Sequence, residues 1–161
     1  MRTRALFLLF VATIAPRVAA QQPPAPEPVL DVVLPADSLR ATLAPAIVST
    51  RMLEDRTTRE LLNSGFPARL HYRLELWEAS WPFDSRSRSV EWDVIVKYDP
   101  LAKHYIVARS FPDRAVAVPL GSFAELHDAQ DATARAFVPA ISPPTDHKRR
   151  YYYFASLEVE S

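Results

Sequence analysis

The four histidines are the first residues to consider for chemistry, since imidazole binds metals and transfers protons. They are His71, His104, His127 and His147. Two ligands four residues apart on a helix can share a metal, and the nearest approach to that pattern is His127 with Asp131. We interpret this pair as part of a solvated helix face, and His71 and His104 as exposed residues on polar strand faces. The sequence therefore predicts no metal site.

Serines and carboxylates are the next candidates, because hydrolysis needs a nucleophile beside a base, or two carboxylates. The serines gather in residues 80–89 and at Ser110, without the glycine-flanked elbow of many hydrolases. Glu91 and Asp93 should share one strand face about 7 Å apart, a separation that suits a two-carboxylate site. Alternating acids on a wet face also serve solubility, and we favour that interpretation. We predict no catalytic residue, and a hydrolase is the weakest of the functions considered.

The composition excludes further kinds of site. The chain has no cysteine, which removes disulfides, thiolate metal sites and cysteine nucleophiles. Two glycines among 161 residues leave no material for a glycine-rich phosphate loop. Nineteen basic residues balance nineteen acidic ones, so no basic surface for nucleic acid is expected. We predict no bound cofactor and no nucleic-acid partner.

Large apolar side chains occupy one expected loop. Trp81 and Phe83 either fold back onto the sheet or present a contact surface, and folding back is the simpler interpretation. The competing hypothesis is a partner-binding surface made of Trp81, Phe83, Arg86 and Arg88. Tryptophan and arginine often dominate interfaces, and Pro82 stiffens the aromatic pair. The serines between the arginines indicate mobility and speak against this surface.

One basic run precedes a group of aromatic residues. Lys148, Arg149 and Arg150 are followed by residues 151–154, which are Tyr-Tyr-Tyr-Phe. Basic and aromatic side chains together can contact anionic lipid headgroups. We favour the simpler interpretation that this is the start of a strand whose tyrosines enter the core.

The N-terminal residues 1–20 have the pattern of a secretory signal peptide. Arg2 and Arg4 precede an apolar run over residues 5–15, and small residues lead up to Ala20. The run would span only about 17 Å, well short of a bilayer core of about 30 Å. We expect export to the periplasm or the medium with cleavage after Ala20; the alternative is retention as an anchor. Cleavage would leave 16 basic residues against 19 acidic ones.

The remaining length suits a single domain. Residues 21–28 contain four prolines, which predicts an extended linker. Residues 29–161 should form one globular domain, because 48% apolar residues suffice for a core.

The pattern of apolar and polar residues predicts an α+β fold with a mainly antiparallel sheet of about six or seven strands and two short helices. A sandwich-like arrangement of the strands is one variant of this fold. Strict alternation over residues 70–76 and 90–98 indicates a sheet with one wet face, and short connections favour antiparallel pairing. Strands are expected at 29–34, 41–53, 68–78, 90–98, 104–109, 115–120 and 148–160, and helices at 55–64 and 121–137.

Several local details accompany this architecture. Residues 68–78, 90–98 and 104–109 should be consecutive neighbours, with both helices on one side of the sheet. Residues 85–89 should be a polar loop. The last strand, apolar on both faces at its start, should be central.

Capping patterns mark the two helix starts. Thr57 with Glu60, and Ser122 with Glu125, have the spacing of capping boxes. Gly65 stands where the end of the first helix needs a positive φ.

Three segments resemble a secreted bacterial family of domains of unknown function. They are Gly65-Phe66-Pro67 with residues 69–76, Trp81 and Asp84; the hairpin of residues 94–101 and 104–107; and residues 121–126. The resemblance covers roughly residues 35–160 and implies a signal peptide, but no activity. Similar chains continue past the last strand, whereas this sequence ends at Ser161.

Two functional classes follow from these observations. The favoured one is a non-catalytic envelope module that binds a protein partner, including the extracellular sensor region of a membrane protein. The alternative is a carrier of a small apolar or lipid ligand, held between the helices and the sheet. A ligand-sized apolar cavity would favour the carrier, and a filled core with an exposed aromatic patch would favour the binding module.

Overall fold

The computed structural model describes residues 27–36, 44–144 and 149–160, which contain seven strands and two helices. They form a five-stranded and a two-stranded antiparallel sheet. The expected α+β class with a mainly antiparallel sheet is confirmed. In chain order the elements are β1 (Val29–Val33), β2 (Ala46–Thr50), α1 (Arg56–Asn63), β3 (Ala68–Ala79), β4 (Ser85–Asp99), β5 (His104–Ser110), β6 (Val118–Phe123), α2 (Leu126–Ala134) and β7 (Arg150–Glu160).

The larger sheet has the strand order β6-β5-β4-β3-β7. β3, β4 and β5 are consecutive antiparallel neighbours, as their alternating patterns predicted. β7 lies at the edge beside β3, so the expectation that the last strand is central was wrong. Its second apolar face is exposed at Tyr152 and Phe154 and is not covered by another described element.

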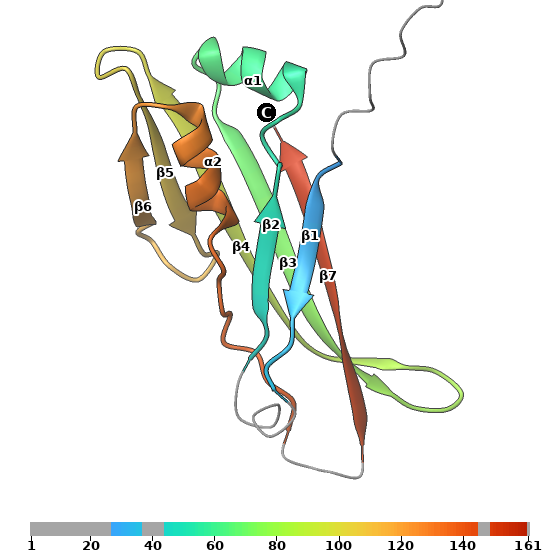
Figure 1. Cartoon of the computed structure of the whole chain (residues 1–161). Helices are drawn as coiled ribbons and strands as arrows, with labels where there is room; N and C mark the ends of the chain where they lie inside the picture. The colour runs from blue at the N-terminus through green and yellow to red at the C-terminus, as the bar shows by residue number, and fades with distance from the viewer. Residues whose placement is uncertain (1–26, 37–43, 145–148, 161) are drawn as a thin grey trace, which may run out of the picture.

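A second layer covers one face of this sheet. β1 and β2 form the small sheet, α2 lies beside β2, and α1 lies over one end of the large sheet (Figure 1). Leu62 of α1 and Ala129 of α2 join the same buried cluster as Leu70 of β3. Both helices therefore lie on one side of the sheet, as expected.

The core consists of the inward-facing row of each strand. Leu70, Tyr72, Leu74 and Leu76 of β3 are buried, whereas Arg69 and Arg73 between them are exposed. This is the period-two pattern of a sheet covered on one face.

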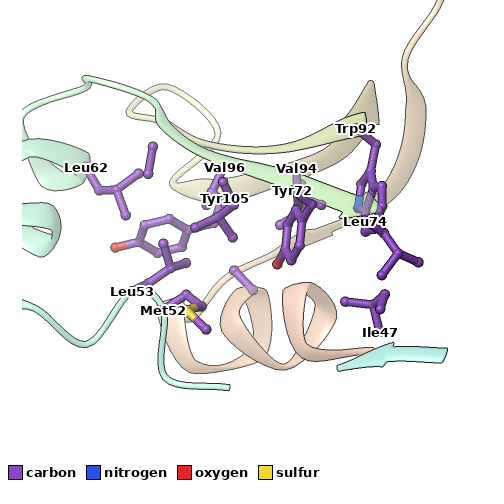
Figure 2. Close-up of a cluster of buried hydrophobic side chains, with 14 of the residues drawn as sticks. Ile47, Met52, Leu53, Leu62, Tyr72, Leu74, Trp92, Val94, Val96 and Tyr105 are labelled. Atoms are coloured by element: carbon purple, nitrogen blue, oxygen red, sulfur yellow. The ribbon is translucent and has the colours of Figure 1, made fainter. Parts of the chain in front are cut away.

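Aromatic contacts close the centre of the core. Figure 2 shows Tyr72 and Trp92 side by side, and their ring centroids lie 5.1 Å apart in a stacked arrangement. Phe137 meets Trp92 edge-on at 4.9 Å. Ser49 Oγ and Tyr72 Oη form a 2.6 Å hydrogen bond, so the buried hydroxyl of Tyr72 has a partner.

Some element boundaries differ from those expected. Residues 85–89 belong to β4, and all of them except Ser87 pair with the end of β3, so the polar loop predicted there was wrong. Exposed serines and arginines do not prevent pairing where a partner strand supplies the hydrogen bonds. The strand expected at 41–53 is the shorter β2, and residues 41–43 of that prediction lie outside the described residues.

The largest error concerns residues 115–125. Val118–Phe123 form β6, which pairs with β5, so the predicted helix start and the Ser122–Glu125 capping box were wrong. α2 begins at Leu126, and its N-cap Glu125 makes no side-chain capping bond. Pairing with β5 outweighs the local helix signal at Ser122.

The first helix starts at a different cap from the one predicted. Asp55 is the N-cap and its Oδ2 accepts from the Thr58 backbone N–H at 2.9 Å, so the Thr57–Glu60 box was wrong. Gly65 has φ +89°, which confirms the positive φ expected after this helix.

Candidate interaction surface

The connection between β3 and β4 projects beyond the rest of the sheet (Figure 1). We call residues 80–88 the hairpin tip; it comprises a five-residue turn and the first four residues of β4. Trp81 is 95% exposed and Phe83 82% exposed. The expectation that these rings pack back onto the sheet was wrong, because the turn lies past the end of the core.

Hydrogen bonds brace the turn from within and from β7. Asp84 accepts from the Ser80 backbone N–H through Oδ1 at 3.1 Å, and from Tyr152 Oη through Oδ2 at 2.9 Å. Ser80 Oγ donates to the Phe83 carbonyl at 2.7 Å. The hydrogen bond to Asp84 raises the pKa of Tyr152 above its usual value. Trp81 and Phe83 thus lie on a turn whose conformation is held by these hydrogen bonds.

The arginines of the tip lie on its two opposite faces. A register shift follows Leu76, so Arg88 lies opposite Leu76 and Arg86 lies opposite Trp77. Since Leu76 and Trp77 point to opposite faces of β3, so do their partners. Arg86 donates to Glu75 Oε1 at 2.9 Å, whereas Arg88 forms no ion pair with any described residue. Ser85 and Ser89 pair with Glu78 and Glu75 of β3, whereas Ser87, between the two arginines, is the residue left unpaired at the register shift.

The basic run that precedes β7 lies next to the tip. Arg150 pairs with Ala79, the last residue of β3. Arg149 donates to both oxygens of Glu78, at 2.7 and 2.8 Å. Arg150 is exposed and has no described ionic partner, and Lys148 lies outside the described residues. The fold therefore brings together two features that are more than 60 residues apart in the sequence.

Sequence reasoning missed the residues that support this surface. Tyr152 was expected to enter the core, yet it braces Asp84 and stacks on Trp77 at 6.5 Å between centroids. Glu75, which holds Arg86, accepts a second bond from Trp77 Nε1 at 2.8 Å. These contacts depend on the register of three strands, which no local motif encodes.

Carboxylates on the outer face of the sheet are held by neighbouring strands. Asp93 accepts from Arg69 at 2.8 Å and lies 2.8 Å from His71 Nδ1. Arg73 donates to Glu91 at 2.8 Å. Glu91 and Asp93 share a face as expected, but each is engaged by its own cationic or hydrogen-bonding partner. This arrangement stabilises strand pairing and does not leave a free acid–base pair.

The same contacts shift the titration of two carboxyl groups. Burial raises the pKa of Asp93, but hydrogen bonds and charges from Arg69 and His71 together hold it below its usual value. The pKa of Glu75 is lowered mainly by the hydrogen bond from Arg86, and also by the bond from Trp77. Both groups are therefore ionised well into the acidic range.

The three described histidines have separate local partners: His71 contacts Asp93, His104 contacts the Ala102 carbonyl and His127 contacts Asp131. His71 is only 21% exposed at its side chain, so the expectation of an exposed residue was wrong there. His127 lies 3.6 Å from Asp131 on the solvent side of α2, as expected. His147 lies outside the described residues. Among the residues that the structure describes, no three potential ligands gather around one point.

A small void of about 10 Å³ lies between α2 and the large sheet, beside Ile47, Tyr72 and Trp92. A larger hollow of about 1050 Å³ opens between β1, the start of α1 and β7. Its apolar lining includes Leu30, Ala155 and Leu157.

Comparison with known proteins found no matching family model, no matching curated protein and no matching solved structure. Neither of the two described helices is both long and apolar enough to span a bilayer.

Proposed function

We propose that the chain is an exported, non-catalytic binding module that contacts another component of the cell envelope through the hairpin tip. The observation that carries this proposal is the exposure of Trp81 and Phe83 on a braced turn. Folded proteins rarely leave two large rings this exposed on one short turn unless the rings contact a partner.

The preorganisation of the turn supports a binding role. Contacts of Asp84 with Ser80 and Tyr152 restrict the turn before any partner arrives. The turn therefore loses little conformational entropy on binding, and the rings of Trp81 and Phe83 can serve as anchors. Export is part of the proposal and rests on the pattern of residues 1–20.

Site-specific photocrosslinking in the producing cell tests this function. A photoreactive residue at position 83 should capture an envelope component. The same residue at position 101 should not: Leu101 is 95% exposed at the turn between β4 and β5, remote from the tip. Equal capture at both positions, or none at position 83, would contradict the proposal.

A stability control belongs with this experiment. Trp81→Ala combined with Phe83→Ala should leave the thermal midpoint within about 2 °C of the wild type, because exposed rings contribute little to folding. A large loss of stability would show that the rings belong to the core and would refute the binding role.

A carrier of a small apolar or lipid ligand is the second candidate. The hollow between β1, the start of α1 and β7 is large enough for a ligand, and it opens beside a helix and an edge of the large sheet. Native mass spectrometry of the purified protein should then show a bound apolar molecule that Leu157→Arg removes. An empty wild-type protein would count against this candidate.

A further inference from the structure

We propose that the hairpin tip docks on an anionic lipid surface, with Trp81 and Phe83 entering the headgroup region and Arg86, Arg88 and Arg150 surrounding them. This inference rests on the proposed function and names the partner of the same surface.

The first argument is the size of the tip. Stable protein interfaces bury about 800 Å² on each partner and need a matching shape. The tip is a narrow turn between two paired strands, and its two most exposed rings lie on five residues. A lipid surface requires no shape complementarity, so a narrow projecting hairpin can enter it.

The second argument is the kind of side chain at the end of the hairpin. Tryptophan and tyrosine favour the water–lipid interface, where an aromatic ring is partly desolvated and its polar atom stays wet. Trp81 and Phe83 lie at the turn, and Tyr152 lies behind them, bonded to Asp84. From the end of the hairpin inward, the apolar rings of Trp81 and Phe83 come before the hydroxyl of Tyr152. Polarity changes in the same order from the lipid interior to the water.

The third argument is charge. Residues 75–88 and 149–152 carry four arginines and three carboxylates, a net charge of +1. Glu75 and Glu78 are engaged by Arg86 and Arg149, and Asp84 is engaged by Tyr152. Arg88 on β4 and Arg150 on β7 are left without a described anionic partner. Each can contact a lipid phosphate, a gain of about fivefold in binding per arginine.

The positions of Arg86 and Arg88 fit a hairpin that enters the lipid surface end-on. Arg86 and Arg88 lie on opposite faces of the hairpin, so a guanidinium flanks the aromatic turn on each side. Long arginine stems can follow the apolar surface while the charged heads stay at the phosphates. A hairpin inserted end-on is then held from both sides.

Co-flotation with lipid vesicles tests the inference on the protein exported from a bacterial host. The wild type should float with vesicles that contain phosphatidylglycerol and bind more weakly to phosphatidylcholine alone. The Trp81→Ala, Phe83→Ala double variant should lose at least tenfold in apparent affinity, whereas Leu101→Ala should bind like the wild type. Because all variants share the same N-terminal segment, any retained leader contributes equally to each.

Charge reversal gives a second matched pair on one strand. Arg88→Glu should weaken binding to phosphatidylglycerol vesicles by about fivefold or more, with little change on phosphatidylcholine. Lys97→Glu makes the same charge change in β4 but far from the tip, and should have little effect. An equal loss for both variants would show that net charge, and not the tip, governs binding, and would overturn the inference.

Tryptophan fluorescence identifies the group that enters the lipid. Of the three tryptophans, Trp92 is buried at 2% exposure and Trp77 is half-buried against Tyr152, so most of a blue shift on adding vesicles should come from the exposed Trp81. Trp81→Phe should retain flotation and lose most of the shift. If the wild type does not float, or the double variant floats equally well, the inference is overturned; crosslinking of a protein at position 83 would then still support the binding module. Failure of both experiments would refute both proposals.

Discussion

At the scale of single residues, the outer face of the sheet is organised by charge. Asp93 receives Arg69 from one side of its carboxylate and His71 from the other. Arg69 also reaches Glu160 on β7 at 3.2 Å, so one guanidinium joins three strands. These ion pairs are partly exposed. They favour this alignment of the three strands more than they add to the free energy of unfolding.

Asp93→Asn tests this network through its pH dependence. The pKa of Asp93 is lowered in the folded state, so its ionised form contributes stability above about pH 4. That contribution is lost as the pH falls through the folded-state pKa. Urea unfolding should show the variant less stable by about 1–2 kcal/mol at neutral pH, with a smaller difference in strong acid.

The exposed Asp113 provides the control for that comparison. Asp113→Asn should change the free energy of unfolding little at either pH. A difference between wild type and Asp93→Asn that stays constant from neutral to acid pH would show that packing, not ionisation, explains the loss.

The residues of the proposed binding surface were identifiable from sequence only as residue types. Trp81, Phe83, Arg86 and Arg88 were singled out because large rings and arginines in a loop need an explanation. The sequence did not predict their exposure, because the length by which the hairpin extends past the core depends on where the neighbouring strand β7 begins, at Arg150 opposite Ala79. Sequence spacing carries no information on that distance.

At the scale of elements, strong alternation predicted strands well, whereas the two capping-box patterns placed the helix starts wrongly. β3 and the second half of β4 show period-two patterns that burial enforces. The Ser122–Glu125 spacing lies in a segment that pairs with β5 instead. A capping box is worth about 1 kcal/mol, less than the several ladder bonds that β6 gains.

Gly65→Ala isolates one correct element-level prediction. Gly65 has φ +89°, and a methyl group there would meet no atom within 4 Å. Any loss is therefore backbone strain, about 1 kcal/mol, or roughly 4 °C in the thermal midpoint. Gly65→Asn should cost less, since asparagine tolerates the left-handed region better. An alanine variant as stable as the wild type would refute the strain.

At the scale of the whole molecule, the class and the β3-β4-β5 order were predictable, whereas the place of β7 was not. Apolar residues on both faces of its first half suggested burial on both sides. One of those faces instead carries Tyr152, which supports the hairpin tip. An exposed aromatic face on an edge strand can thus resemble the pattern of a central strand, because both place apolar side chains on the second face.

The strand order also predicts the order in which the strands pair during folding. β3, β4, β5 and β6 are joined by short connections and can pair as they meet, whereas β7 must close a long loop to reach β3: Arg69 lies opposite Glu160, 91 residues away. Loop closure of that length is entropically costly, so β7 should dock late. Pulse-labelled hydrogen exchange during refolding should show amides of β4 and β5 protected before those of β7. Simultaneous protection would instead mean that the edge strand belongs to the folding nucleus.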